Sequence, residues 1–577
     1  MEFNFIPSTY QQKIFDFFAT GVGNAVINAK AGSSKTTTAV KALDYIPSEK
    51  KVLFLAFNKS IANELAERIQ DKPNVYAWTF HALGYRIIRE KYPNITLDAF
   101  KYKTFINKNL PKLRDNKDYL SPEDYERYKK NCEELTDLSR YNKCQSEAEI
   151  GRVAEKYGIL CVDDEVSTVE KILAWGKQNI STIDYTDMEW LPYELGLGTK
   201  KFKFDWIIID EAQDTSPIRQ ELFRKCLRRG TRFVAIGDKD QTINAWCGSD
   251  ESAFENFLKE SNTIQLDLPI CYRCPTAVIK KLQTLVPDIQ AAPNAIEGKV
   301  NYDVSIFDAK PGDMVLCRNS APLSVLYADY IKKNINAYIK GGDIGNNLNA
   351  LMDSTNSTTL SFDFSVDGVI PRLYKSLLKS LRKSVETEGL AFEDAIQTEK
   401  FMKLYDSIKT IEILGNGTTD LMYLKSRINK IYTDSNGPGI CLSTVHKAKG
   451  LEADNIFIVC PSLMPSPLAT KPWEIEAEQH IQYVAWSRAK KTLNFVDEKI
   501  FSPQRCYMDL GSVKNEILDA AEKLRNLYHK DYLNFKNVMV DNIFAKKTNT
   551  SKAINTNNSQ QPKKKIGVNK FKSFLKK

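Results

Sequence analysis

The chain has 577 residues, of which 42% are hydrophobic and 27% charged, and this composition excludes a wholly disordered chain and a fibrous rod. No run of 18 uncharged apolar residues occurs, and the amino terminus has no basic region followed by an apolar core, so we expect no transmembrane helix, no membrane partner and no secretory signal. Lys and Arg number 81 against 72 Asp and Glu, a net charge of +9, which is a weak indication of a polyanionic partner.

Short apolar runs alternate with helical patterns in the first part of the chain. Helices are predicted at residues 36–43 and 61–69. Strands are predicted at residues 24–29, 52–57, 75–80, 206–210 and 232–237. Continuous apolar strands between helices indicate a parallel sheet that is covered on both faces. The long interval between the third and fourth strands has helical spacing, with a helix start at Ser121-Pro122-Glu123-Asp124.

A second α/β pattern begins near residue 263. Its strands are predicted at residues 314–317, 440–445, 455–460 and 492–496. A mostly helical block interrupts this pattern too, and from about residue 546 the chain becomes rich in Lys, Asn, Thr, Ser and Gln, which predicts a disordered tail. The predicted organisation is a first core, 1–88 and 190–262; a helical insertion, 89–189; a second core, 263–345 and 437–505; a reduced helical insertion, 346–436; a helical extension, 506–545; and the tail, 546–577.

The segment Ala29-Lys30-Ala31-Gly32-Ser33-Ser34-Lys35-Thr36 lies between a predicted strand and a predicted helix, where a phosphate-binding loop belongs. The backbone N–H groups of its central residues, Ala31, Gly32, Ser33 and Ser34, and the helix N-terminus would surround the phosphates. Lys35 would reach the β- and γ-phosphates of ATP, and Thr36 would hold Mg²⁺. The usual pattern has Gly at the positions of Ala29 and Ser34, and an ordinary strand–turn–helix is the alternative for this segment alone.

The predicted strand at 206–210 ends in two adjacent acids, Asp210 and Glu211. In a magnesium nucleotide site, Asp210 would hold the metal and Glu211 would polarise the attacking water. The alternative is a solvated acidic turn. The eleven cysteines show no metal-ligand spacing, so we expect reduced thiols and a cytoplasmic protein, or a nuclear one in a eukaryotic host.

Seven motifs in one order make residues 5–500 resemble the superfamily 1 DNA helicases of the UvrD/Rep/PcrA type. Any one motif could occur by chance, but the ordered series leaves little room for coincidence. The motifs are Ala56-Phe57-Asn58-Lys59, Thr79-Phe80-His81-Ala82, Asp210-Glu211-Ala212-Gln213-Asp214, Gly237-Asp238-Lys239-Asp240-Gln241, Tyr272-Arg273, Thr444-Val445-His446-Lys447-Ala448-Lys449-Gly450-Leu451-Glu452 and Tyr483-Val484-Ala485-Trp486-Ser487-Arg488-Ala489.

This resemblance implies an α/β fold with two RecA-like parallel-sheet cores of the P-loop NTPase class, each with an inserted, mostly helical subdomain. ATP and Mg²⁺ would bind between the cores. The resemblance assigns Gln241 as the γ-phosphate sensor, and Arg273 and Arg488 as arginine fingers. It places Tyr272 on the adenine face, Gln11 at the adenine edge and Glu452 near the ribose.

The same resemblance assigns single-strand contacts to both cores. It gives Trp246 a base-stacking role, since an aromatic ring can carry a base, and the alternative for this residue is a buried core tryptophan. Cys271 and His480 depart from the family pattern, which usually has Asn and Arg there. The other implied nucleic-acid contacts are Asn58, Lys59, Thr79, His81 and His446.

The implied activity is that of an ATP-dependent motor that translocates on single-stranded DNA and unwinds duplex DNA. The acidic motif and Gly450-Leu451-Glu452 favour 3′→5′ movement, although the last motif also resembles the 5′→3′ group. The alternative is an ATP-switched, single-strand-binding translocase that does not unwind productively. RNA is a further possible substrate.

Ten lysines and no acids follow Asp541, which leaves 71 basic and 72 acidic residues in the rest of the chain. The predicted motor is therefore nearly neutral, and the excess charge belongs to the tail. The tail is either a solvated terminus or a nonspecific nucleic-acid tether. The segment Phe571-Lys572-Ser573-Phe574-Leu575 also resembles a docking peptide for a sliding clamp.

Overall fold

The computed structural model describes residues 6–116, 120, 122–159, 161, 164–198, 201–243, 252–386, 390–433, 437–467, 469, 472–501 and 510–527. The chain divides into two compact units. The larger unit comprises Met1–Gly341 and Asp434–Pro503, and the smaller unit comprises Gly342–Thr433 and Gln504–Lys577. No helix among the described residues is both long and apolar enough to cross a membrane.

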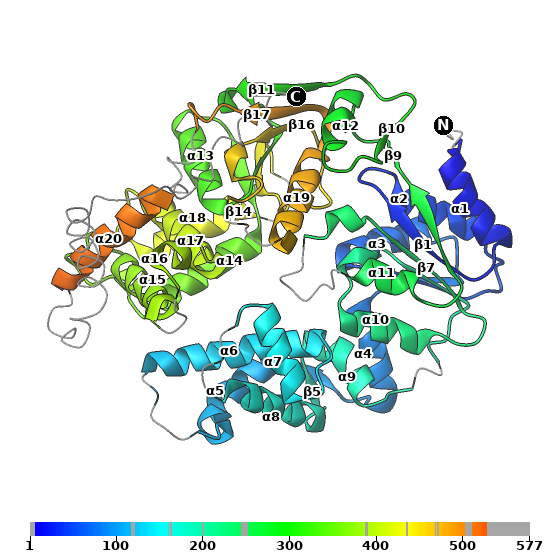
Figure 1. Cartoon of the computed structure of the whole chain (residues 1–577), viewed down its shortest axis with the longest axis horizontal. Helices are drawn as coiled ribbons and strands as arrows, with labels where there is room; N and C mark the ends of the chain where they lie inside the picture. Colours follow the sequence, from blue (N-terminus) through cyan, green and yellow to red (C-terminus); the bar gives the residue numbers. More distant parts are fainter. Residues whose placement is uncertain are drawn as a thin grey trace, which may run out of the picture. The chain divides into compact units, whose positions relative to one another are not determined.

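The larger unit contains a first sheet of six parallel strands in the order β3-β2-β6-β7-β1-β8. Figure 1 labels two of its strands, β1 and β7. The strands are β1 (Asn24–Ala29), β2 (Val52–Ala56), β3 (Val75–Thr79), β6 (Trp206–Ile209), β7 (Arg232–Gly237) and β8 (Thr263–Leu268). The predicted strands of the first core are confirmed. The predicted boundary at residue 262 is wrong by one strand, because β8 pairs in parallel with β1 and so belongs to the first sheet.

Apolar side chains cover both faces of this sheet, as the continuous apolar strands predict. Along β2, Phe54 belongs to one buried cluster, with side chains of α1, α2 and α3. Leu53 and Leu55 belong to another, with side chains of α4, α10 and α11. Successive side chains of a strand point to opposite faces, so each face receives its own layer of helices. The helices are α1 (Thr9–Thr20), α2 (Lys35–Ala42), α3 (Lys59–Arg68), α4 (Phe80–Lys91), α10 (Pro217–Cys226) and α11 (Ala253–Leu258).

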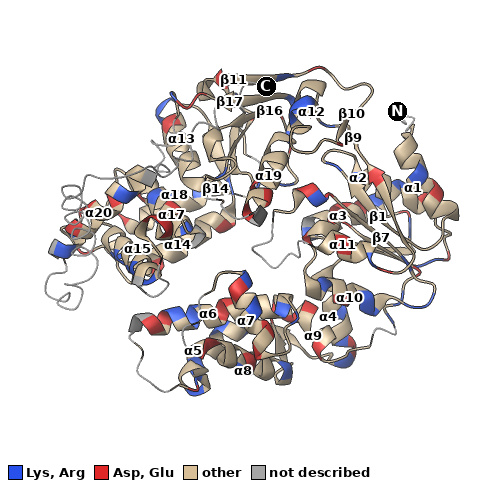
Figure 2. Ribbon diagram, in the orientation of Figure 1, with Lys and Arg blue, Asp and Glu red and all other residues tan. Residues whose placement is uncertain are grey.

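The interval between α4 and β6 is mostly helical, as predicted. It contains α5 (Lys101–Leu113), α6 (Pro122–Tyr141), α7 (Glu147–Lys156), α8 (Glu165–Gln178) and α9 (Tyr185–Glu194), with the short pair β4 (Thr96–Leu97) and β5 (Thr182–Ile183). Its hydrophobic core is continuous with that of the first sheet. Acidic and basic side chains are interspersed along α6 (Figure 2), so this helix carries no one-sided charge.

The second sheet of the larger unit is also parallel, in the order β11-β17-β16-β12-β15-β13. The strands are β11 (Lys299–Val304), β12 (Met314–Cys317), β13 (Ala337–Lys340), β15 (Ile440–Thr444), β16 (Ala453–Ile458) and β17 (Ala489–Val496). The helices beside it are α12 (Thr276–Leu282), α13 (Ser320–Lys332) and α19 (Pro472–Trp486). The short pair β9 (Ile270–Cys271) and β10 (Gln290–Ala291) leads into it. The predicted second α/β core is confirmed.

The smaller unit is mostly helical. It contains α14 (Gly342–Asp353), α15 (Val369–Glu386), α16 (Phe392–Ala395), α17 (Glu399–Gly415), α18 (Leu421–Ile431), β14 (Tyr432–Thr433) and α20 (Leu510–Leu527). Helix α20 is tied to the others by Glu516, which accepts hydrogen bonds from Tyr405 at 2.8 Å and Lys409 at 2.7 Å. The rest of the predicted C-terminal extension and the predicted tail lie outside the described residues.

Candidate nucleotide and nucleic-acid site

The predicted phosphate loop connects β1 to the N-terminus of α2. Gly32 has a φ of +68°, and a Cβ atom there would lie 2.7 Å from the Cβ of Arg273 and 2.8 Å from the Sγ of Cys271. Both the backbone conformation and the space therefore require glycine. Ser34 also adopts the left-handed conformation, with a φ of 61°. Serine thus holds the shape that glycine usually supplies in such loops, at a cost in backbone strain.

Lys35 begins α2 and points to the acids at the end of β6, because its Nζ lies 2.9 Å from the Oε1 of Glu211. Burial alone would lower the pKa of Lys35, but Glu211, Asp210 and Asp238 outweigh it and hold that pKa above its usual value. Three carboxylates around one lysine leave the site short of positive charge. The carboxylate oxygens of these three acids are therefore suited to bind a further cation, such as a divalent metal ion.

The two adjacent acids differ in their proton affinity. Burial and the charge of Glu211 raise the pKa of Asp210 to about 6. Burial would raise the pKa of Glu211 as well, but Lys35 and Lys449 lower it to about 2. Glu211 also accepts a 2.6 Å hydrogen bond from Gln213 Nε2. The solvated acidic turn is thus wrong, since Asp210 is only 4% exposed.

Two polar atoms near this point are buried without a hydrogen-bond partner, the Oδ1 of Asn28 at the end of β1 and the Oγ of Ser33 in the loop. Buried polar atoms are normally satisfied, so orphaned ones mark places where a ligand or water supplies the missing bond. Together with the buried acids, they fit a phosphate-bearing ligand and a divalent cation. Thr36 occupies the second position of α2, one residue after Lys35.

The second core contacts the loop directly through Tyr483 of α19. Its hydroxyl accepts a 2.9 Å hydrogen bond from the N–H of Ala31 and lies 3.1 Å from the Oδ2 of Asp238. Lys449, which follows β15, lies 2.5 Å from the Oδ2 of Asp214 and donates to the carbonyl of Gln241 at 2.8 Å. The Gln241 side chain donates to Asp238 at 2.6 Å. The two cores therefore share one hydrogen-bonded network at the phosphate loop.

Both arginines predicted as fingers come from the second core, but their surroundings differ. Arg273 pairs with Glu452 at 2.6 Å and donates to the carbonyl of Ser487 at 3.2 Å. Arg488 is almost fully buried and donates to the carbonyls of Val484 and Leu451 and to the Ser487 hydroxyl. Among the described residues no carboxylate pairs with Arg488, and burial together with Arg273 lowers its pKa to about 10. A buried cation without an anionic partner is suited to an anionic ligand.

The residues predicted to hold the adenine lie together. Gln11 is buried, so a plain surface position is excluded, and its Nε2 donates to the Thr38 hydroxyl at 2.9 Å. Its Oε1 accepts from the N–H of Ser8 in a capping box for α1 and lies 3.4 Å from the Tyr272 hydroxyl. Tyr272 is 44% exposed, which leaves its ring available for stacking.

The predicted strand-contacting residues of the first core share one edge of the sheet. Strands β2 and β3 pair in parallel with Ala56 opposite Thr79. Asn58 caps α3 by accepting from the N–H of Ile61, and Thr79 caps α4 by accepting from the N–H of Ala82. Two helix N-termini thus lie side by side, an arrangement that suits phosphate groups. Lys59 begins α3 and is exposed.

His81 makes a contact that the sequence analysis did not anticipate. Its Nδ1 lies 3.3 Å from the Oε1 of the buried Glu189 on α9. The ring of Tyr185, also on α9 and 54% exposed, stands edge-on to His81 at 6.2 Å. Helix α9 has no local sequence feature that marks either residue. His446 follows β15 in a turn, and Trp246 lies outside the described residues.

A phosphate loop at the N-terminus of a helix, a pair of acids at the end of a parallel strand and a second parallel-sheet core define a P-loop NTPase with two RecA-like cores. Residues 10–262 match the UvrD/REP helicase N-terminal domain, and residues 439–496 match the UvrD-like helicase C-terminal domain. The chain belongs to the superfamily 1 helicases of the UvrD/Rep/PcrA type.

Two similar proteins are each named ATP-dependent DNA helicase PcrA. The one from Staphylococcus aureus is 23% identical, and the match covers 82% of this chain and 81% of the relative. The one from Staphylococcus epidermidis is 23% identical, and the match covers 89% of this chain and 87% of the relative. The similarity therefore spans most of each chain.

Proposed function

We propose that the protein is an ATP-dependent DNA helicase, which translocates 3′→5′ on single-stranded DNA and unwinds duplex DNA. The observation that carries the proposal is the joint phosphate site, in which Lys35 and Glu211 of the first core lie in one network with residues of the second core. Because groups from both cores would surround the γ-phosphate, binding and hydrolysis of ATP would change how the cores are held together. The family and its named relatives support the same activity.

In this mechanism Lys35 exchanges Glu211 for the β- and γ-phosphates of ATP. Glu211 then loses the stronger of its two neutralising lysines and keeps Lys449, so its carboxylate becomes a better proton acceptor for the attacking water. Gln213 keeps that carboxylate oriented through its 2.6 Å hydrogen bond. Thr36 and Asp210 would hold Mg²⁺, which supplies positive charge beside the phosphates.

Arg488 and Arg273 would neutralise the charge that develops on the transferred phosphoryl group. Arg488 is the better placed of the two, since Arg273 is already paired with Glu452. An arginine finger contributes about 10³- to 10⁵-fold to the rate of such reactions. Gln241 would sense the γ-phosphate, because its side-chain amide, which donates to Asp238 in this structure, would donate to the phosphate instead. Tyr272 and Gln11 would hold the adenine, with Glu452 near the ribose, and the loop residues Ala31, Gly32, Ser33 and Ser34 would contact the phosphates.

Single-stranded DNA would cross the edge where α3 and α4 begin. The helix N-termini capped by Asn58 and Thr79, together with Lys59 and His81, would bind phosphates, and the exposed ring of Tyr185 would carry a base. His446 of the second core would also contact the strand. Trp246 of the first core would provide a further ring for base stacking. A base stacked on an aromatic side chain contributes about 1–3 kcal/mol.

The proposal is tested by ATP hydrolysis with and without a single-stranded oligonucleotide, and by strand separation on duplexes with a 3′ or a 5′ overhang. We expect DNA-stimulated hydrolysis, and unwinding of the 3′-overhang substrate. Lys35→Ala should abolish both activities. Hydrolysis without separation of either duplex would contradict the helicase assignment. Unwinding of the 5′-overhang duplex alone would show that translocation runs 5′→3′ and not 3′→5′.

Arg488→Ala gives a sharper test of the joint site. The variant should still bind ATP, but its hydrolysis rate should fall by about 10³-fold or more, because the finger acts in the transition state. Arg228→Ala is the matched control, since Arg228 is an exposed arginine that pairs with Asp205. Normal turnover by Arg488→Ala would exclude a site shared between the cores.

A further inference from the structure

Glu189 is a fully buried carboxylate on α9, in the helical insertion. Both of its oxygens lie 3.0 Å from the Nε of Arg219 on α10, and its Oε1 lies 3.3 Å from the Nδ1 of His81 on α4. A buried carboxylate is tolerated only where cations or donors compensate its charge. Glu189 of α9 therefore binds side chains from two other helices, and one of them, His81, is a predicted DNA contact.

Arg219 extends this cluster to the other predicted DNA contacts. Its guanidinium carbon lies 5.5 Å from the ring centre of Phe57 and 5.7 Å from that of Phe80. Phe57 precedes the capping residue of α3, and Phe80 precedes His81. The guanidinium thus stands against both helix starts, so the cluster of Glu189, Arg219 and His81 supports the edge where the DNA backbone would lie.

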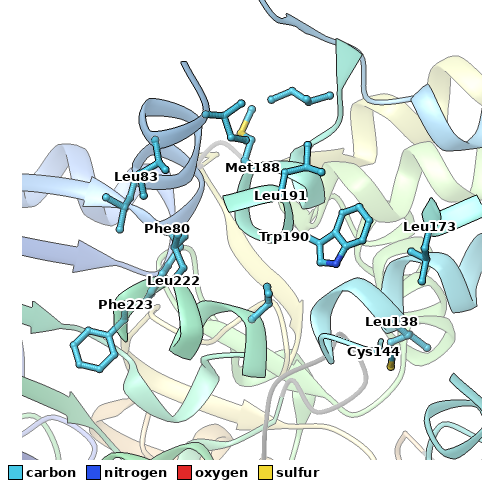
Figure 3. Packing of buried hydrophobic residues seen from close by; sticks show 14 of the residues in the cluster. Phe80, Leu83, Leu138, Cys144, Leu173, Met188, Trp190, Leu191, Leu222 and Phe223 are labelled. Atoms are coloured by element: carbon cyan, nitrogen blue, oxygen red, sulfur yellow. The ribbon is translucent and has the colours of Figure 1, made fainter. Parts of the chain in front are cut away.

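The backbones of α4 and α9 hold Glu189 in register with His81. A Cβ atom on Gly84 would lie 1.8 Å from the carbonyl oxygen of Met188, so the two helices touch at that point without intervening side chains. His81 precedes Gly84 by three residues and lies on the same face of α4. Met188 directly precedes Glu189, and Leu83, Met188 and Leu191 belong to one buried cluster (Figure 3).

The start of α9 is fixed as well. Asp184 and Asp187 form a capping box, and Arg140 of α6 binds both carboxylates at 2.8 and 2.9 Å. Arg140 is fully buried. The insertion therefore holds α9 rigidly from its first residue, and a rigid element can orient a side chain on its neighbour.

We propose that Glu189 is a positioning residue for DNA binding, which holds the His81 ring through Nδ1 so that Nε2 is presented to a phosphate of the bound strand. A ring that donates from Nδ1 to Glu189 and from Nε2 to a phosphate carries a positive charge, which both anions match. About a third of the His81 side chain is exposed, which gives a phosphate access to it. The inference rests on the proposed function, and it gives the helical insertion a share in the DNA contact.

The test measures the concentration of single-stranded oligonucleotide that half-saturates ATP hydrolysis. Glu189→Gln keeps the shape of the side chain but removes its charge. We expect that concentration to rise about tenfold, because a charge-assisted phosphate contact is lost. The kcat at saturating DNA and the KM for ATP should change less than twofold, since Lys35, Glu211 and Arg488 are untouched. The salt dependence of DNA binding should also weaken by about one phosphate contact.

His81→Ala and the double variant test whether Glu189 acts through His81. Each single change should give the same loss of DNA affinity, and the double variant should lose no more than either. Glu194→Gln is the matched control, because Glu194 is another glutamate of α9, with its side chain 3% exposed, and it pairs with Lys177 at 2.8 Å. That control should leave DNA affinity within twofold of the wild type. If Glu189→Gln does not fold, Glu189→Asp, which keeps the charge but shortens the reach to His81, must show the loss.

Unchanged DNA affinity in Glu189→Gln overturns the inference. It is also overturned if the double variant loses the product of the two single-variant losses, because Glu189 and His81 would then act independently. An equal loss in Glu194→Gln also overturns it, because the effect would then be a general one of α9. A wild-type ATPase that single-stranded DNA does not stimulate overturns the proposed function, and the inference falls with it. A stimulated wild type with an unaffected Glu189 variant overturns the inference alone.

Discussion

The contact between Gly84 and Met188 predicts a large effect for a single methyl group. The Cβ of Gly84→Ala would lie 1.8 Å from the Met188 carbonyl oxygen, whereas such contacts do not fall below 3.0 Å. The helices α4 and α9 must therefore separate by about 1.2 Å, the difference between those distances. This interface belongs to one of the two buried clusters that cover the faces of the first sheet, so the structure cannot yield without losing packing.

The magnitude follows from the neighbouring side chains. Ile87 and Ile88 lie one turn from Gly84, and Leu191 lies one turn from Met188, all fully buried or nearly so. Burial of each contributes about 1.5–3 kcal/mol, and a gap of about 1 Å forfeits a quarter to a half of the contact energy. The loss is then about 1–4 kcal/mol, and the higher helix propensity of alanine returns about 1 kcal/mol. We expect a net loss of about 2 kcal/mol.

Hydrogen exchange of the α4 and α9 amides measures this effect locally, because it reports the free energy of opening of each segment. A loss of about 2 kcal/mol corresponds to exchange about 30-fold faster. Gly151→Ala is the control, since Gly151 lies in α7 with nothing within 4 Å of the new carbon, and it should gain up to about 1 kcal/mol. Exchange in Gly84→Ala as slow as in the wild type would refute the close contact and the register of Glu189.

Three further predictions concern the phosphate loop and its neighbours. Tyr483→Phe leaves the Ala31 N–H without its acceptor and should lower the free energy of unfolding in urea by about 2 kcal/mol, whereas the same change at the exposed Tyr45 should have no effect. Ser34→Gly removes the strain of a left-handed serine and should raise the free energy of unfolding by up to about 1 kcal/mol, which a higher thermal midpoint would report. A lower midpoint would show that Ser34 is not strained. Hydrogen bonds from the Cys274 thiol and from the backbone N–H groups of Cys274 and Arg273 lower the pKa of Cys271 to about 7, below the ordinary 9.0. A lowered thiol pKa stabilises the fold fully above pH 9, and this stability is lost as the pH falls through 7. The free energy of unfolding of the wild type should therefore rise between pH 7 and 9 relative to Cys271→Ser, and parallel pH profiles would contradict this.

The sequence by itself determined the two parallel-sheet cores and the places where their chemistry lies. Strands that are buried on both faces must be apolar throughout, so β1, β2, β6 and β7 are visible as apolar runs. The polar residues that follow such runs, Asp210 and Glu211 above all, stand out for the same reason. The ordered motifs are local in sequence as well, so they place the chain in its family without reference to tertiary contacts.

Only the tertiary structure decided which distant groups meet. Ala31 and Tyr483 are 452 residues apart, and no local pattern indicates that the Tyr483 hydroxyl accepts a hydrogen bond from the Ala31 N–H. Strand β8 belongs to the first sheet because it pairs with β1. Glu189 meets His81 only because α9 packs against α4 at Gly84. Local sequence encodes backbone preference and burial, whereas a buried charge or hydroxyl acquires its role from the partner that the fold brings to it.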